Sequence, residues 1–122
     1  MVGKTILVVD DSPVQLKMVC TVLAAQNYQL ITAGDGEEAL QQVVAHKPDL
    51  VILDVVMPKM DGFQACRKIK SSPAVKHIPV IMLTSKNQKV DEFWGKRQGA
   101  DVYLTKPFEE SVLLKEVATL LK

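Results

Sequence analysis

The chain has 122 residues, 48% of them hydrophobic, and a formal net charge of +1. This length suits one domain with a real core, so we expect a single domain over residues 1–122 with no output domain appended. The charge balance excludes a polybasic nucleic-acid surface or an acidic tail, and the apolar stretches are too short to insert into a membrane. The lead Met1–Thr5 has no signal-peptide hydrophobic region, so the expected location is cytoplasmic.

Short apolar runs alternate with helix-period patterns along the chain. Strands are predicted at Thr5–Val9, Gln29–Ala33, Leu50–Leu53, Val80–Leu83 and Val102–Leu104. Helices are predicted from the spacing of Leu16, Val19, Cys20 and Leu23; of Ala39, Leu40, Val43 and Val44; of Phe63, Cys66 and Ile69; of Val90, Phe93, Trp94 and Arg97; and of Val112 or Leu113, Glu116 or Val117, Leu120 and Leu121. Five strands alternating with five helices indicate βαβ units around a parallel sheet. The two cysteines fall on helical apolar positions and are expected to be buried, reduced thiols.

Acidic residues follow two of the predicted strands, and a lysine follows another. Asp10 and Asp11 close the first strand, Asp54 closes the third, and Lys106 lies just after the fifth. Thr84 follows the fourth strand. Ligands of open parallel sheets bind outside the carboxyl ends of the strands, so these side chains should meet. We therefore predict one acidic, metal-binding pocket facing one ammonium group, a combination that suits chemistry on phosphate.

Each of these residues also has a purely structural interpretation. Asp11 could cap a first helix that begins at Ser12-Pro13, which is a good N-cap and N1 pair. Thr84 could cap the fourth helix, and Lys106 could be a solvated loop lysine. We favour a shared site because all of these polar groups fall at one edge of the predicted sheet.

The motifs that carry the most information are Ile6–Asp11 (ILVVDD), Asp54-x-x-Met57-Pro58-x-Met60-Asp61-Gly62, Thr84-Ser85 and Lys106-Pro107-Phe108. Together they resemble those of a response-regulator receiver domain of two-component signalling, and the resemblance covers essentially the whole chain. It implies an α/β, flavodoxin-like (βα)5 fold, a doubly wound five-stranded parallel sheet of order 2-1-3-4-5. It also implies that a histidine kinase or phosphotransfer domain donates a phosphoryl group to one aspartate, with Mg²⁺ as cofactor.

The resemblance assigns a role to each site residue. Asp54 matches the phosphoacceptor, a carboxylate nucleophile that forms an acyl phosphate and also faces the metal. Asp11 would bind Mg²⁺ directly, Asp10 would act through a coordinated water, and the backbone carbonyl of Val56 matches a further ligand. Lys106 would help to neutralise the charge that develops on the transferred phosphoryl group.

A second group of residues matches the switch of this family. The hydroxyl of Thr84 would donate a hydrogen bond to a phosphate oxygen, and Tyr103 matches the aromatic residue that changes rotamer as Thr84 moves. The resemblance also implies a cis Lys106–Pro107 bond that places the ammonium over the pocket.

Two residues beside the site differ from those of chemotaxis receivers. Val56 is apolar where those proteins often have a polar residue, and Lys86 is basic where some have an acid that orients water. Because the Val56 side chain cannot hydrogen-bond water, we expect slower self-dephosphorylation than in fast chemotaxis receivers. Lys86 could bind phosphate or merely point outward.

The fourth helix is unusual because it contains the only tryptophan of the chain. The segment from Lys86 to Ala100 resembles that of stand-alone receivers in twitching-motility and phototaxis systems. We expect Phe93 and Trp94 to pack on the sheet and neighbouring helices. The alternative is that Trp94 lies partly exposed beside Tyr103 and forms a docking surface. In either case the exposed side of the fourth helix, fifth strand and fifth helix is the expected output surface.

Three classes of function fit these observations. The function that we favour is a phosphorylatable signalling switch, and the suggested pathway is motility or phototaxis. An alternative is that the protein acts as a phosphate sink for a shared kinase. A phosphorylation-independent interaction module would not need the complete acidic site. A small phosphatase would need a cap domain and a second aspartate two residues after Asp54. We therefore do not expect an enzyme in the usual sense. The expected partners are a kinase and a downstream protein target. The protein is expected to be a monomer that forms transient dimers at most.

Overall fold

The computed structural model describes residues 3–122, so the first two residues of the lead into the first predicted strand lie outside the described residues. Its elements in chain order are β1 (Thr5–Val9), α1 (Pro13–Ala24), β2 (Gln29–Ala33), α2 (Gly36–His46), β3 (Leu50–Leu53), α3 (Gly62–Ser71), β4 (Val80–Thr84), α4 (Lys89–Arg97), β5 (Val102–Thr105) and α5 (Glu110–Leu120). The three N-terminal strands have the predicted bounds, and the last two each extend one residue further.

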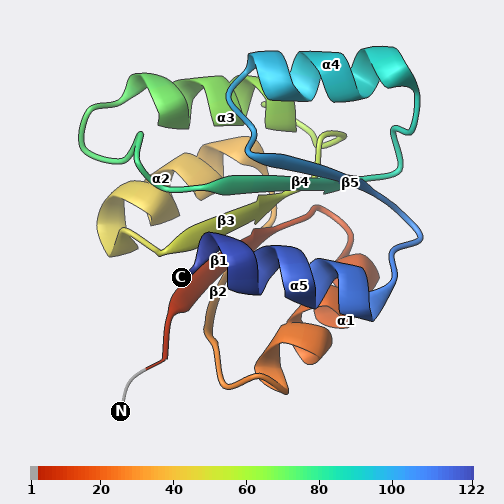
Figure 1. Cartoon of the computed structure of the whole chain (residues 1–122). Helices are drawn as coiled ribbons and strands as arrows, with labels where there is room; N and C mark the ends of the chain where they lie inside the picture. Colours follow the sequence, from red (N-terminus) through yellow and green to blue (C-terminus); the bar gives the residue numbers. More distant parts are fainter. Residues whose placement is uncertain (1–2) are drawn as a thin grey trace.

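The strands form one parallel sheet in the order β2-β1-β3-β4-β5, which confirms the predicted topology. Helices α1 and α5 cover one face of this sheet, and α2, α3 and α4 cover the other (Figure 1). The strand order reverses between β1 and β3, because the chain runs outward to β2 and then returns to the other side of β1. The crevice at such a reversal is where ligands of this architecture bind.

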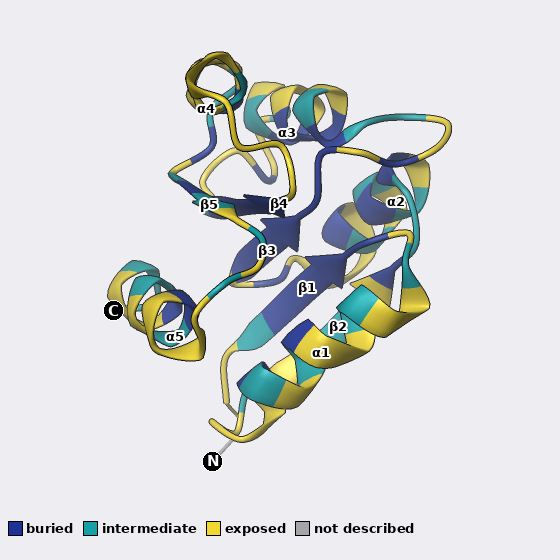
Figure 2. Cartoon of the chain, turned by 90° about the vertical axis from the view of Figure 1, so that its right-hand side faces the viewer, coloured by how far each residue is buried: buried dark blue, intermediate teal, exposed yellow. Residues whose placement is uncertain are grey.

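The central strands are buried on both faces, which explains their continuous apolar runs. In β1, Leu7 and Val9 join the core beneath α2 and α3, whereas Ile6 and Val8 join the core beneath α1 and α5. Figure 2 shows the same burial along β1, β3 and β4. The sheet therefore lies between two hydrophobic cores, and the strands that they share end at a common edge.

The N-termini of α1 and α4 show that neither Asp11 nor Thr84 is a helix cap. Ser12 is the N-cap of α1, since its hydroxyl accepts a hydrogen bond from the amide of Gln15 at 3.3 Å. Asp11 is therefore not needed as the cap. Helix α4 begins after Gln88, four residues beyond Thr84, so Thr84 does not cap it either.

The predicted inward positions hold for most helices. In α5 the alternatives resolve to Leu113 and Val117, which are fully buried, while Val112 is exposed. In α2, however, the prediction for Val44 is wrong because its side chain is exposed, and the adjacent Val43 carries the contact with the core.

Both cysteines are free thiols, but they differ in burial. Cys66 is fully buried, as expected, and burial raises the pKa of its thiol to about 12. Cys20 is only half-buried, and burial raises the pKa of its thiol as well. No helix between residues 3 and 122 is long and apolar enough to span a membrane.

Helix α4 departs from the expected packing. The expectation that Phe93 and Trp94 pack inward is wrong, since the two residues are 58% and 49% exposed. Their rings contact each other edge to face with centroids 6.1 Å apart, and the Arg97 guanidinium lies 5.8 Å from the Phe93 ring centre. The reason is that Gly95 faces the sheet. Residues of a helix are about 100° apart, so Phe93 points away from the sheet when Gly95 points toward it.

Candidate functional site

The register of the sheet brings the predicted carboxylates together. Val9 pairs with Leu53, and the amide of Asp54 donates to the carbonyl of Val9 at 3.1 Å, so β1 and β3 end side by side. Oxygen atoms of Asp10, Asp11 and Asp54 all lie within 4.8 Å of one another. Three carboxylates therefore converge at the point where the strand order reverses.

Lys106 lies against two of these carboxylates. Its ammonium nitrogen is 2.5 Å from Oδ2 of Asp10 and 3.4 Å from Oδ2 of Asp54. The backbone amide of Lys106 donates to the carbonyl of Thr84 at 2.8 Å, which ties β5 to the end of β4, and the Lys106–Pro107 bond is cis. The side chain is 11% exposed, so the ammonium is not a solvated loop lysine. A charge this buried requires the close carboxylates as partners.

Backbone amides hold the second oxygen of each buried carboxylate. Oδ1 of Asp10 accepts from the amide of Ser12 at 2.9 Å, and Oδ1 of Asp54 accepts from the amide of Val55 at 2.7 Å. These bonds fix the two side chains, while Asp11 remains exposed to solvent. The donor set fits Mg²⁺, a hard cation that prefers carboxylate and carbonyl oxygens and keeps several waters.

The two predicted switch residues, Thr84 and Tyr103, both form hydrogen bonds with the backbone of Lys86. Thr84 is fully buried, and its hydroxyl oxygen accepts from the amide of Lys86 at 3.3 Å. The phenol of Tyr103 donates to the carbonyl of the same residue at 2.7 Å. Tyr103 is 9% exposed, and burial raises its pKa to about 12, with Asp91 and Glu92 adding to the effect. The neutral phenol is therefore held inward.

The two residues expected to tune the site point to solvent. The side chain of Lys86 is exposed, and its ammonium lies 3.8 Å from a carboxylate oxygen of Asp91 in α4. This position favours the outward alternative for Lys86 over phosphate binding. The Val56 side chain is also exposed and stands at the mouth of the site.

A groove of about 1000 Å³ opens from the acidic cluster along α1. At one end it is lined by the three carboxylates and Lys106, and further along by Val14, Met18 and Phe108. The charged end therefore has an apolar extension that runs between α1 and the start of α5.

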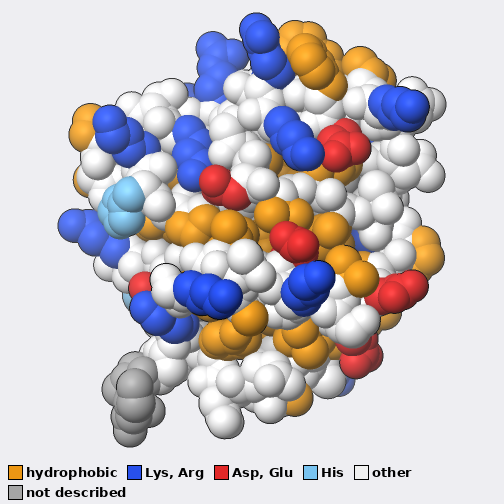
Figure 3. All heavy atoms as spheres, viewed as in Figure 1, with side chains coloured by type: hydrophobic (Ala, Val, Ile, Leu, Met, Phe, Trp, Pro, Cys, Tyr) orange, Lys and Arg blue, Asp and Glu red, His pale blue; other side chains and the backbone are white. Residues whose placement is uncertain are grey.

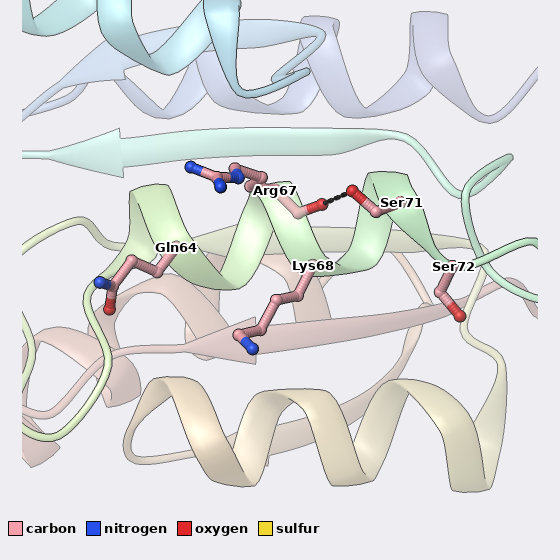
Figure 4. A pocket seen from close by; sticks show the side chains of 5 residues that line it. All are labelled: Gln64, Arg67, Lys68, Ser71 and Ser72. Atoms are coloured by element: carbon pink, nitrogen blue, oxygen red, sulfur yellow. Dashed lines mark hydrogen bonds between the residues drawn. The ribbon is translucent and has the colours of Figure 1, made fainter.

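A second, smaller hollow of about 410 Å³ lies on the outer face of α3 (Figure 4). It is lined by Gln64, Arg67, Lys68, Ser71 and Ser72. The hydroxyl of Ser71 donates to the carbonyl of Arg67 at 2.7 Å, which is a hydrogen bond within α3. The hollow contains none of the groups of the acidic cluster.

Comparison with known proteins identifies the family of this chain. The family described as response regulator receiver domain matches residues 6–118. The chain is a response-regulator receiver domain. The receiver is 42% identical over 116 residues to protein PilH of Pseudomonas aeruginosa, covering 95% of this chain and 96% of that protein. It is also 41% identical to the response regulator PleD of Caulobacter vibrioides, covering 94% of this chain but only 25% of PleD.

Solved structures agree with the fold. The receiver has a TM-score of 0.90 and 35% identity to the chemotaxis protein CheY4 of Vibrio cholerae, covering 98% of this chain and 99% of that one. It has a TM-score of 0.91 and 27% identity to the receiver domain of a sensor histidine kinase from Pseudomonas aeruginosa, with 98% of each chain covered. That structure has a magnesium ion coordinated in its active-site cleft.

One contact of the predicted switch residue Tyr103 was not predicted from the sequence. Gly95 lies directly against the ring of Tyr103, in the place that the sequence analysis offered to Trp94. A signal was available, because a glycine inside a predicted helix costs about 1 kcal/mol relative to alanine and usually has a packing reason.

Proposed function

We propose that this receiver domain is a phosphorylatable signalling switch, with Asp54 as the phosphoacceptor. The observation that carries the proposal is the convergence of three carboxylates and one buried ammonium at the edge of the sheet. A structural salt bridge alone would need only one carboxylate beside Lys106. The additional carboxylates gather negative charge that a divalent cation neutralises.

In the proposed transfer, an oxygen of the Asp54 carboxylate attacks the phosphorus of a phosphohistidine on the kinase or phosphotransfer partner. The phosphorus–nitrogen bond breaks as the phosphorus–oxygen bond forms, and the imidazole nitrogen takes up a proton as it leaves. Lys106 lies 3.4 Å from the acceptor carboxylate, where its charge stabilises the phosphoryl oxygens. The bond between Val55 and Oδ1 of Asp54 keeps the nucleophile oriented.

Mg²⁺ would supply charge neutralisation of the phosphoryl oxygens. Asp10, Asp11 and Asp54 would hold it, and the Val56 carbonyl stays a predicted ligand. The magnesium ion in the related receiver structure supports this part of the proposal. The protein then catalyses only its own phosphorylation and dephosphorylation, rather than turning over a separate substrate.

The output would pass through Thr84 and Tyr103 to α4 and the adjoining strand β5 and helix α5. Leu53 pairs with Met82, so Thr84 and Asp54 follow neighbouring strands at the same edge of the sheet, where Thr84 would respond to a phosphoryl group on Asp54. Tyr103 and Thr84 both bond to the backbone of Lys86. The exposed Phe93 and Trp94 then offer a surface for a downstream protein. Resemblance of the α4 segment to twitching-motility and phototaxis receivers suggests motility as the output.

Replacing the acceptor tests the chemistry. Asp54→Asn keeps the shape of the side chain but removes the nucleophilic carboxylate, so acetyl phosphate with Mg²⁺ should no longer label the protein. Incorporation is measured as acid-labile phosphate or by intact-mass spectrometry. Unchanged incorporation in the variant would contradict the assignment of Asp54.

A matched control separates this effect from loss of the fold. Asp35→Asn makes the same substitution at the N-cap of α2, where asparagine caps as well as aspartate. This control should be labelled like the unmodified protein.

A further inference from the structure

Gly95 is the buried position of α4, and it lies against two side chains of the sheet. A β-carbon placed on it would be 2.7 Å from Cδ2 and 2.9 Å from Cε2 of Tyr103, and 2.9 Å from the sulfur of Met82. Carbon atoms in contact normally lie about 3.5–4.0 Å apart. Even a methyl group at this position therefore cannot coexist with the present positions of the ring and the thioether.

Space, rather than backbone conformation, is what requires glycine here. Gly95 lies inside a regular helix, where the backbone alone would favour alanine over glycine. The neighbouring Gly99, by contrast, has a φ of +105° and is needed for its conformation. Helix α4 therefore has glycine, a poor helix former, at the position where the Tyr103 ring packs against it.

We propose that Gly95 is a positioning residue for the Tyr103 switch, and that the missing side chain leaves room for the ring to lie inward beneath α4. This inference rests on the proposed function, because it concerns how the switch of the phosphorylation site is set. In the inward position the phenol donates to the carbonyl of Lys86, whose amide is bonded to Thr84. Gly95 therefore determines how readily the ring reaches the residue it shares with Thr84.

The ring, rather than the helix, is the part that would move if a side chain were added. The C-terminal end of α4 is anchored, since the Cys66 thiol donates to the carbonyl of Gln98 at 3.5 Å and the amide of Asp101 donates to the carbonyl of Val80 at 2.8 Å. Tyr103 lies on β5, the edge strand, so its ring can rotate outward to solvent. The outward ring loses its bond to Lys86 and its burial.

Ionisation of Tyr103 reports the position of its ring. In the unmodified protein the inward phenol should ionise at a pKa of about 12, against an ordinary value of 10.0. In Gly95→Ala the outward phenol should ionise near the ordinary value, a change of up to about a hundredfold in the proton affinity. The measurement is ultraviolet difference titration of the phenolate, carried out in a Tyr28→Phe background so that Tyr103 is the only tyrosine.

Gly34→Ala serves as the matched control. A β-carbon at Gly34 would meet only a carboxylate oxygen of Glu38, at an ordinary 3.6 Å, so the Tyr103 pKa should stay at about 12. A Tyr103 pKa that is the same in Gly95→Ala as in the unmodified protein would overturn the proposal.

A double-mutant cycle provides a second test that does not depend on the titration. Gly95→Ala should lower the melting temperature of the unmodified protein because of the contacts with the ring. In a Tyr103→Ala background the ring contacts are absent and only the contact with Met82 remains, so the same substitution should lower the melting temperature less. Equal effects of Gly95→Ala in the two backgrounds would also overturn the proposal.

Labelling by acetyl phosphate distinguishes this inference from the proposed function. Gly95 contacts none of the carboxylates, so Gly95→Ala should still be phosphorylated on Asp54. If the unmodified protein were not labelled, the proposed function would fail, whereas the Tyr103 titration would still decide the role of Gly95.

Discussion

Tyr103 makes the stability of the protein depend on pH in the alkaline range. Its pKa is raised to about 12 in the folded protein, chiefly by burial, so the unfolded chain loses the phenolic proton first as the pH rises. The stabilisation is complete below pH 10 and is lost as the pH approaches 12. The free energy of unfolding should therefore fall by about 2 kcal/mol between pH 9 and 11.5 on account of this residue.

Tyr103→Phe isolates that contribution. The variant keeps the ring but has no ionisable group, so its free energy of unfolding should fall by about 2 kcal/mol less over the same range. Urea unfolding at pH 9 and pH 11.5 measures both proteins. Cys66, whose pKa is also raised to about 12, lowers the stability of both and cancels in the comparison. Equal losses in the two proteins would show that the phenol is not held neutral by the fold.

At the scale of the element, the ends of β1 and β3 create a local excess of negative charge. Asp10, Asp11 and Asp54 crowd together, and Lys106 offsets only part of their charge. The proposed Mg²⁺ site exists only in the folded protein, so the metal should stabilise that state by mass action, by about 2.7 kcal/mol at a hundred times its dissociation constant. Asp11→Ala should lose most of this stabilisation, which calorimetry with and without Mg²⁺ measures.

Asp35→Ala is the control for the metal experiment. It removes the N-cap of α2 and should lower the melting temperature, yet it leaves the carboxylate cluster intact. Its melting temperature should rise with Mg²⁺ as much as that of the unmodified protein. The same Mg²⁺ response in Asp11→Ala would remove Asp11 from the ligand set.

The strands were predictable because burial on both faces leaves a continuous apolar run, as in Leu50–Leu53. Helix α4 was also predicted, but its inward face was not, because its apolar spacing suggests an inward stripe of Phe93 and Trp94 whereas Gly95 is the residue that packs on the sheet. Hydrophobic periodicity indicates which side chains of a helix could be buried. It does not show which face of the helix has room to pack against the neighbouring strands. Phe93 and Trp94 therefore appear in the sequence as core residues although their side chains are exposed. Figure 3 shows hydrophobic side chains at the surface near the top of the molecule, where Figure 1 places α4.

At the scale of the whole molecule, the residues of the acidic cluster could be predicted because parallel strands end at one edge and the register is set by burial. Strand-end position alone places Asp10, Asp54 and Lys106 within reach of one another. The link through the backbone of Lys86 could not be predicted in this way. A carbonyl or amide is present at every position, so the residue type does not show which one Tyr103 or Thr84 will use.

The path from site to surface predicts that Trp94 reports the switch. The two conformations of such a switch differ by a few kcal/mol, and a ligand shifts them only by binding one better. Beryllofluoride, a mimic of the acyl phosphate, should engage Thr84 and draw it toward Asp54, which alters the Tyr103 contacts with α4 next to Trp94. Addition of Mg²⁺ and then of beryllofluoride should therefore change the fluorescence of the only tryptophan in two separable steps.

Variants assign each fluorescence step. Asp54→Ala should remove the beryllofluoride step because the mimic has no carboxylate to join. Thr84→Ala should diminish that step while leaving the Mg²⁺ step intact, since Thr84 is a proposed switch residue and not one of the proposed metal ligands. If beryllofluoride bound, as shown independently by fluorine NMR, and Trp94 fluorescence did not change, α4 would not move with the site. The downstream partner would then have to read a different face, and the groove along α1, which begins at the carboxylates themselves, would be the next surface to examine.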